Sequence, residues 1–294
     1  MKDTAVLLID CPDRKGLVAR VSALLYEHGA NILHADQHQD HELGMFFMRV
    51  EWALSSAKHK DSSSSTPVFD LVKFSQAFAP IASELQMHWQ IGVMNLPPRV
   101  ALFCSQYLHC MADLLHRWQS RELSCDLRVI VSNHREVEKL AAYYGVPFEY
   151  VEVSAATRLE AEARQLRILE QYGVELVVLA RYMQILSPSF VAKYPAAIIN
   201  VHHSFLPAFI GARPYHAAHA RGVKLIGATS HYVTEVLDDG PIIEQDVARI
   251  SHRDEVEDLV ARGRDLERVV LARAVRWHLD RRILSYGNKT IVFD

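Results

Sequence analysis

Short apolar runs alternate with amphipathic stretches over the middle of the chain, and this alternation constrains the fold more than any other feature. Residues 100–104 and 174–180 are almost entirely apolar and have the length of buried strands. Residues 158–172 repeat apolar side chains at helical spacing and are followed by Gly173, a residue type that commonly ends a helix. Strands that alternate with helices in this way are typical of βαβ units, which predicts a mostly parallel sheet.

Further elements of the same kind extend this α/β region. The expected strands are 127–132, 148–153 and 197–200, and the expected helices are 111–118, 135–144 and 261–284. An open parallel sheet binds ligands outside the carboxyl ends of its strands. Asn200 ends one of these strands, so we expect the functional site beside it.

The first 94 residues follow a different order. We expect strands at 4–10, 30–33, 44–52 and 87–91, and helices over 17–29 and 69–85. This βαββαβ order is that of a ferredoxin-like domain. Residues 55–66 are polar and rich in serine, which indicates a surface insertion. Two prolines mark an extended linker at 95–99, so we expect one domain at 1–94 and a Rossmann-like second domain at 95–294.

Composition narrows the choice of partners. The chain has 294 residues and a formal net charge of -3, which gives no basic surplus for nucleic acid or an anionic membrane. Its start lacks the apolar stretch of a secretory signal, and no run reaches the ~20 apolar residues of a membrane span. The four cysteines have no CxxC spacing and are expected to be buried thiols of a reducing compartment. We therefore expect a cytoplasmic protein that binds small molecules.

Residues 200–241 gather the groups that polarise a carbonyl and move protons. In an extended segment the side chains of Asn200 and His202 point to the same side, so both can donate to one carbonyl oxygen. Asp238 precedes a turn on a loop that can fold back over them, and a carboxylate beside a histidine favours its charged form. These residues predict an acyl-transfer site that needs no metal, no cofactor and no serine nucleophile.

Two other interpretations of the same segment remain open. Asparagine, histidine and aspartate at strand ends often serve only as turn or capping residues. Five histidines close together in the sequence also suggest a metal site, but no HExxH or similar pattern is present and we expect no metal. These histidines are His202, His203, His216, His219 and His231.

The N-terminal region resembles ACT domains, which commonly bind amino acids where two copies pair. The matching features are Asp10 after the first strand, the turn at 12–16, and residues 29–32 leading into the second strand. The resemblance implies that Asp10, Gly16 and Asn31 meet an amino-acid effector and that the chain forms a homo-oligomer. Gly16 and Asn31 are equally explained as ordinary turn and strand-end residues.

Residues 98–285 resemble the folate-dependent formyltransferases. The motif residues are 200–207, 227–229, 231–234 and 237–243. By motif position, the resemblance implies that Asn200, His202 and Asp238 form the catalytic trio and that residues 181–186 and 234–238 line a pterin pocket. The implied substrate-binding residues are Met183, Gln184, Leu186, His203, His231 and Thr234.

Departures from the family pattern indicate which molecule accepts the formyl group. In the formyltransferases that act on glycinamide ribonucleotide, a glycine-rich loop cradles the substrate phosphate; the matching residues here, 105–110, contain no glycine. The methionyl-tRNA enzymes carry an extra C-terminal domain and need a basic surface. The combination of an N-terminal ACT-like domain with the motif at 200–207 resembles the branch of the family in which water is the acceptor. The resemblance therefore implies hydrolysis of 10-formyltetrahydrofolate to formate and tetrahydrofolate, which supplies formate for purine synthesis and balances the one-carbon pool.

Two rival functions stay open at this stage. One is transfer of the formyl group to an amine such as glycinamide ribonucleotide. The other is an amino-acid sensor whose second domain has lost activity.

Overall fold

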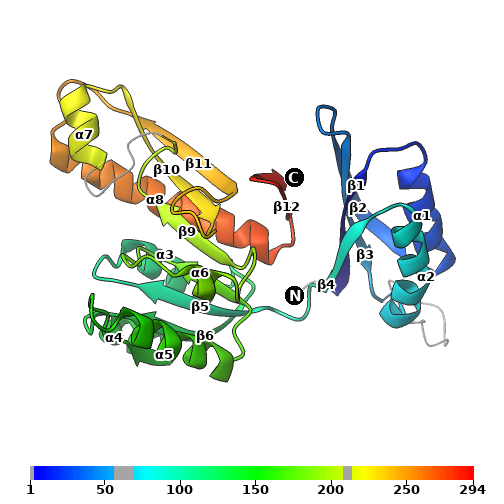
Figure 1. Cartoon of the computed structure of the whole chain (residues 1–294), viewed down its shortest axis with the longest axis horizontal. Helices are drawn as coiled ribbons and strands as arrows, with labels where there is room; N and C mark the ends of the chain where they lie inside the picture. The colour runs from blue at the N-terminus through cyan, green and yellow to red at the C-terminus, as the bar shows by residue number, and fades with distance from the viewer. Residues whose placement is uncertain (1–2, 56–68, 208–213) are drawn as a thin grey trace. The chain divides into compact units, whose positions relative to one another are not determined.

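The computed structural model describes residues 3–55, 69–207 and 214–294. The chain divides into two compact units (Figure 1). Unit 1 comprises Met1–Leu96, Asp280–Leu284 and Val292–Asp294, and unit 2 comprises Pro97–Leu279 and Ser285–Ile291.

Unit 1 has the expected βαββαβ order. Its elements are β1 (Thr4–Pro12), α1 (Leu17–Glu27), β2 (Asn31–Asp40), β3 (Met45–Ala53), α2 (Leu71–Glu84) and β4 (His88–Val93). They form an antiparallel sheet with the strand order β2-β3-β1-β4. Strand β2 is longer than the expected 30–33 because its backbone pairs with β3 as far as Asp40, opposite Met45. Of the serine-rich stretch 55–66, all residues after Ser55 lie outside the described part of the chain.

Each face of the unit 1 sheet is covered differently. Apolar side chains of β1 and β3 pack against Phe74 and Phe78 of α2 and against α1. On strand β3, Arg49 and Glu51 are also buried and form an ion pair of 2.9 Å. The Nε of Arg49 donates to the carbonyl oxygen of Arg281 at 3.0 Å. Residues 280–284 and 292–294 therefore belong to unit 1, whereas the sequence placed the whole of 95–294 in the second domain.

Unit 2 contains a seven-stranded sheet with the order β11-β10-β9-β8-β5-β6-β7. Strands β5 to β9 are parallel, and β10 and β11 extend the sheet in antiparallel pairs, so the predicted mostly parallel sheet is confirmed. The strands are β5 (Arg99–Cys104), β6 (Asp126–Ser132), β7 (Phe148–Tyr150), β8 (Leu176–Leu179), β9 (Ile198–His202), β10 (Leu225–Tyr232) and β11 (Ile242–Arg249). The helices are α3 (His109–Gln119), α4 (Val137–Tyr144), α5 (Arg158–Gln171), α6 (Pro188–Val191), α7 (Pro214–Arg221) and α8 (Val256–Leu279).

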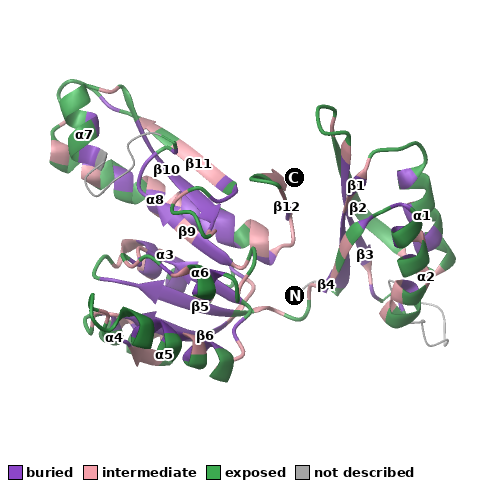
Figure 2. Cartoon of the chain, in the orientation of Figure 1, coloured by how far each residue is buried: buried purple, intermediate pink, exposed green. Residues whose placement is uncertain are grey.

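Central strands of this sheet are buried along their length, while the helices expose their outer surfaces (Figure 2). Residues of α5 and α6 pack with β5, β6 and β8 in one apolar cluster. Helix α8 contacts β9, β10 and β11 and also α3. It ends at Leu279 rather than at the expected Leu284, because the chain turns through Arg281 (φ 50°) into β12 (Ile283–Tyr286), which pairs with β13 (Lys289–Val292). Within the described residues, no helix is both long and apolar enough to cross a membrane.

Candidate active site

A cavity of about 350 Å³ lies at the carboxyl ends of β8 and β9 in unit 2. Its walls come from the loop after β8 (residues 181–186), the end of β9 (200–203) and the loop after β10 (233–238), together with His231. The structure therefore brings the predicted catalytic and substrate-binding residues to one cavity. All of them, from Met183 to Asp238, are among its lining residues.

Strand β9 fixes the directions of Asn200 and His202. It pairs with β8 through Asn200, opposite Leu179, and with β10 through Asn200 and His202, opposite His231 and Thr229. Pairing on both sides keeps the strand extended, so residues two apart face the same way. Both side chains reach the cavity, as their spacing predicted.

The loop after β10 brings Asp238 back to the strand. Thr234 Oγ1 donates to the carbonyl oxygen of Val236 at 3.2 Å, and Asp238 itself has a left-handed backbone (φ 54°). A β-carbon on Gly240 would lie 1.7 Å from the Tyr232 carbonyl oxygen, so only a glycine lets the loop close so tightly. The loop geometry thus delivers the carboxylate to the cavity wall.

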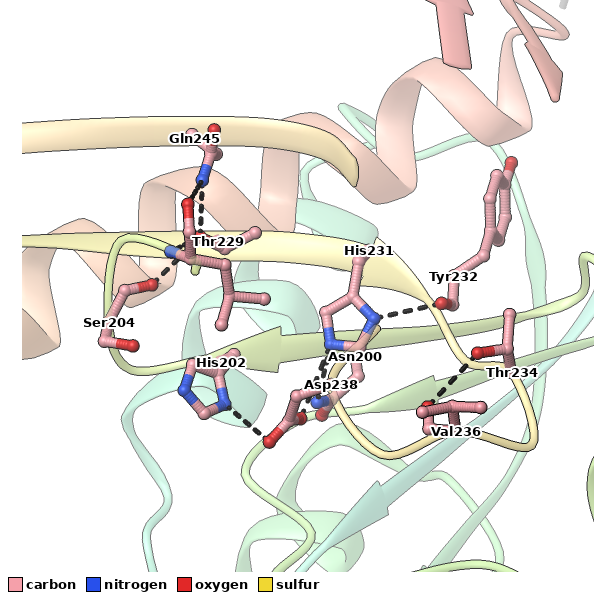
Figure 3. Close-up of polar contacts among 11 residues, drawn as sticks. Asn200, His202, Ser204, Thr229, His231, Tyr232, Thr234, Val236, Asp238 and Gln245 are labelled. Atoms are coloured by element: carbon pink, nitrogen blue, oxygen red, sulfur yellow. Dashed lines mark hydrogen bonds and ion pairs between the residues drawn. The ribbon is translucent and has the colours of Figure 1, made fainter. Parts of the chain in front are cut away.

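Asp238 forms an ion pair with His202. Its Oδ2 lies 3.2 Å from His202 Nδ1, and its Oδ1 lies 3.8 Å from His231 Nε2 (Figure 3). The hydrogen bond from His202 holds the pKa of Asp238 below its usual value, although burial acts in the opposite direction. The carboxylate is therefore ionised at neutral pH and can accept a proton.

His231 orients the amide of Asn200. Its Nδ1 lies 2.9 Å from the carbonyl oxygen of Tyr232, and because a carbonyl only accepts, Nδ1 carries the proton. Burial lowers the pKa of His231, so the ring is neutral and its Nε2 is an acceptor. Asn200 Nδ2 lies 3.3 Å from that Nε2 and donates to it. This arrangement assigns the nitrogen and oxygen of the Asn200 amide.

The second ring nitrogen of His202 is available to a substrate, and it is a donor when the ring carries the charge that a neighbouring carboxylate favours. With Nδ1 engaged by Asp238, its Nε2 is buried and has no hydrogen-bond partner among the described residues. A buried polar atom without a hydrogen-bond partner destabilises the folded chain. A hydrogen bond to a substrate oxygen would remove this cost. His203, the next residue, is also buried, and burial together with the charge of Arg181 lowers its pKa to about 4. It is therefore a neutral imidazole at the cavity wall.

Comparison with known proteins agrees with this geometry. A formyl transferase family model matches residues 98–275, and an ACT domain model matches residues 5–51. The chain is 50% identical over 290 residues to the formyltetrahydrofolate deformylase of Synechocystis sp., covering 99% of this chain and 98% of that protein. It is 49% identical over 294 residues to the deformylase of Bacillus subtilis, covering 100% and 95%. The chain belongs to the formyltetrahydrofolate deformylase family. This confirms the family resemblance seen in the sequence.

A solved structure of this family has the same fold over the whole chain. The formyltetrahydrofolate deformylase of Pseudomonas syringae pv. tomato matches with a TM-score of 0.93 and 48% identity, covering 100% of this chain and 95% of that one. The ACT domain and the formyltransferase domain predicted from the sequence are therefore both present. The roles of individual residues in this member of the deformylase family stay predictions.

The predicted pterin-pocket residues differ in exposure. Leu186 is buried, while Met183 is about half exposed and lies open to the cavity. The backbone N–H of Met183 donates to Ser105 Oγ at 3.0 Å, which ties this wall to the loop after β5. Gln184 lies on the loop after β8 and Thr234 on the loop after β10, and both line the cavity.

The histidines considered as a metal site do not converge within the described ranges. His216 and His219 lie on α7 and do not line the cavity. A different group, His109, Cys110 and Glu267, places one ligand atom each within 4.8 Å of the others. Burial raises the pKa of the Cys110 thiol well above its usual value, and the Glu267 carboxylate is already paired with Arg181 at 3.4 Å, so this group is a poor cation site.

Sequence reasoning missed Glu267 because nothing in its neighbourhood distinguishes it from the other charged residues of α8. Gly263, one turn earlier, is the available signal, since glycine inside a helix is unfavourable unless something packs against it. A β-carbon there would lie 2.1 Å from Tyr215 Oη.

The predicted effector residues lie in unit 1. Asp10 is near the end of β1, and its Oδ2 is 3.0 Å from His88 Nδ1. Gly16 has a left-handed backbone (φ 91°) before α1, and Asn31 is exposed at the start of β2. In the pairing with β3, Asp10 lies opposite Phe47 and Asn31 opposite Ala53, so the two residues are at opposite ends of the sheet within one copy and do not form one site there. The effector role stays a prediction.

Proposed function

We propose that the chain hydrolyses 10-formyltetrahydrofolate to formate and tetrahydrofolate. The curated relatives with this name match it over nearly their full length. The observation that carries the proposal is the ionised Asp238, 3.2 Å from His202 and beside Asn200 at the wall of one cavity. This is the set that addition of water to a formyl group requires: a base, and donors for the oxygen.

In the proposed mechanism the formyl oxygen lies between the Asn200 amide and the His202 imidazole. Asp238 takes a proton from a water as the water oxygen bonds to the formyl carbon. The two donors stabilise the resulting oxyanion. The bond from carbon to N10 of the folate then breaks, and the proton passes to that nitrogen from Asp238 or through His202. The products are formate and tetrahydrofolate.

The cavity suits the pterin end of the substrate. A volume of about 350 Å³ is within the range of small-molecule sites, and its exposed apolar side chains include Met183 and Leu237. Gln184 and Thr234 supply polar groups for orientation. We assign the neutral His203 to holding the attacking water, because an uncharged imidazole both donates and accepts.

We also propose an effector, an oligomeric state and a cellular compartment for the protein. The folate is the substrate, and the mechanism assigns every step to side chains of the chain itself. The ACT domain would take an amino-acid effector, and pairing of two such domains would make the protein a homo-oligomer. The free thiols, of which Cys11, Cys104 and Cys110 are buried, fit a reducing cytoplasm.

The proposal is tested by formate release from 10-formyltetrahydrofolate with and without glycinamide ribonucleotide. We expect formate at the same rate in both reactions and no formylated ribonucleotide. Strict dependence on the ribonucleotide would show a transferase instead. Absence of both products would favour a sensor without catalytic activity.

A further inference from the structure

The place where an α/β sheet usually binds a ligand is filled in this protein by its own side chains. Strand β5 lies between β6 and β8, and the chain leaves it toward β6 and later returns on the other side at β8. The loops after β5 and β8 therefore diverge from a topological switch point, where a crevice normally opens. The cavity of the candidate active site begins on the β8 side of this point.

Ser105 closes the crevice at the level of the backbone. Its N–H donates to the carbonyl oxygen of Arg181 at 3.2 Å, and its Oγ accepts from the N–H of Met183 at 3.0 Å. The same hydroxyl donates to Asn133 Oδ1 at 2.7 Å. The two loops that should part are thus joined.

Four side chains fill the space beyond, and we call them the Glu267 cluster: Glu267, Arg181, His109 and Tyr215. The buried Glu267 carboxylate accepts from Tyr215 Oη at 2.8 Å and lies 2.7 Å from His109 Nε2. Arg181 Nε lies 3.4 Å from it, and the guanidinium is 5.3 Å from the centroid of the Tyr107 ring. Burial alone would raise the pKa of Glu267, but the hydrogen bond from His109 and the charge of Arg181 lower it below its usual value. The cluster is therefore a buried ion pair.

The backbone of Arg181 has a left-handed conformation. Its φ is 63°, a conformation that glycine adopts freely and that an arginine adopts only under strain. Nearby, Gly263 gives up helical propensity so that Tyr215 can reach Glu267. The left-handed backbone of Arg181 and the glycine inside α8 are each locally unfavourable, and both lie at the Glu267 cluster.

The Glu267 cluster adjoins the reacting centre. The His203 ring lies 6.2 Å from that of Tyr215 and 5.1 Å from that of His202, measured between centroids. Arg181 and His203 both line the cavity. An organic acceptor that approached the formyl carbon from the switch point would have to occupy the position of these side chains, whereas a water would not.

We propose that Arg181, held by Glu267, is a specificity-determining residue that fills the switch-point crevice and reserves the formyl group for water. This rests on the proposed hydrolase function and concerns the acceptor alone. Without the block, a primary amine could take the place of water. Its nitrogen would bond to the formyl carbon, the bond to N10 would break, and one amine proton would pass to N10.

The test is the partition of products in R181G with glycinamide or glycinamide ribonucleotide as the added amine. Glycine removes the side chain and suits the left-handed backbone. Arg121 is the matched control, because it is an exposed arginine with a similar φ of 65° at the end of α3. Parent and R121G should give formate alone. R181G should give formylated amine in a share that rises with amine concentration, at least tenfold above the reaction without enzyme.

Two results would overturn the proposal. One is R181G that folds like the parent and divides its products as R121G does. The other is folded R181G that yields neither product, since Arg181 would then serve hydrolysis itself. If R181G does not fold, R181G/E267Q, which leaves no unpaired carboxylate, is measured in the same way. Failure of the parent to release formate would instead refute the proposed function.

Discussion

Replacing Asp238 by asparagine separates the chemistry of the site from its shape. Asparagine has almost the same size as aspartate and tolerates a left-handed backbone well, so the loop with φ 54° should be retained in D238N. The amide, however, accepts no proton from water and carries no charge opposite His202. Activity should therefore fall far more than stability.

The magnitudes follow from the contacts of the carboxylate. The exchange turns a charge-assisted hydrogen bond of 3.2 Å into a neutral one, which lowers the free energy of unfolding by about 1 to 2 kcal/mol. Loss of a general base lowers turnover by about 100-fold to 10,000-fold, equivalent to about 3 to 5 kcal/mol in the barrier. The His202 hydrogen bond lowers the pKa of Asp238, so in the parent kcat/KM should fall only as the pH drops through that depressed value. D238N should lack this acid limb.

The measurements are formate release as a function of pH and thermal unfolding of the full chain. D239N is the matched control, because Asp239 is the exposed neighbour on the same loop, and it should behave like the parent. Turnover of D238N within tenfold of the parent, or an equal loss in D239N, would refute the assignment of the base.

Three further substitutions test the supports of the site. G240A removes no catalytic group but would drive a β-carbon into the Tyr232 carbonyl, so it should lower both the unfolding midpoint and formate release; normal values for both would show that the loop closes in another way. H231A leaves the Asn200 amide without its acceptor, and loss of a neutral hydrogen bond of about 1 kcal/mol predicts a turnover about fivefold lower; an unchanged turnover would remove His231 from the site. Because the pKa of Glu267 is depressed in the folded chain, its stabilising contribution is present above the usual glutamate pKa and is lost as pH falls through the depressed value. E267Q should thus be less stable than the parent at neutral pH and approach it in acid, as measured by urea unfolding across pH. A difference that stays the same at every pH would contradict this.

Elements with strong apolar periodicity were predictable because burial dictates both their sequence and their structure. The parallel strands around β5 and β8 are examples, since each is apolar along its length. Polar strands gave no such signal. Strand β2 is exposed over nearly all of its length and is held as a strand by pairing with β3, which a single sequence does not reveal.

The candidate site was predictable to the extent that its residues lie close together in the chain or match a motif. Asn200 and His202 share one strand, and Asp238 follows from the motif. The contacts that hold these side chains in place were not predictable, because they join residues far apart in the sequence. Asn200 on β9 contacts His231 on β10, and Arg181 after β8 contacts Glu267 on α8. Such pairs follow from the register of the sheet and the position of α8, which arise only in the folded chain.

The discontinuity of unit 1 has a consequence for how the protein is made. The carbonyl groups that receive the buried Arg49 lie at Asp280 and Arg281, and Phe293 is buried close to the last residue. A ribosome releases the ACT strands early, yet the groups that complete their buried ion pair emerge last. Unit 1 is thus completed only after most of unit 2 has been synthesised, and a chain that stops before Asp280 would leave unit 1 incomplete.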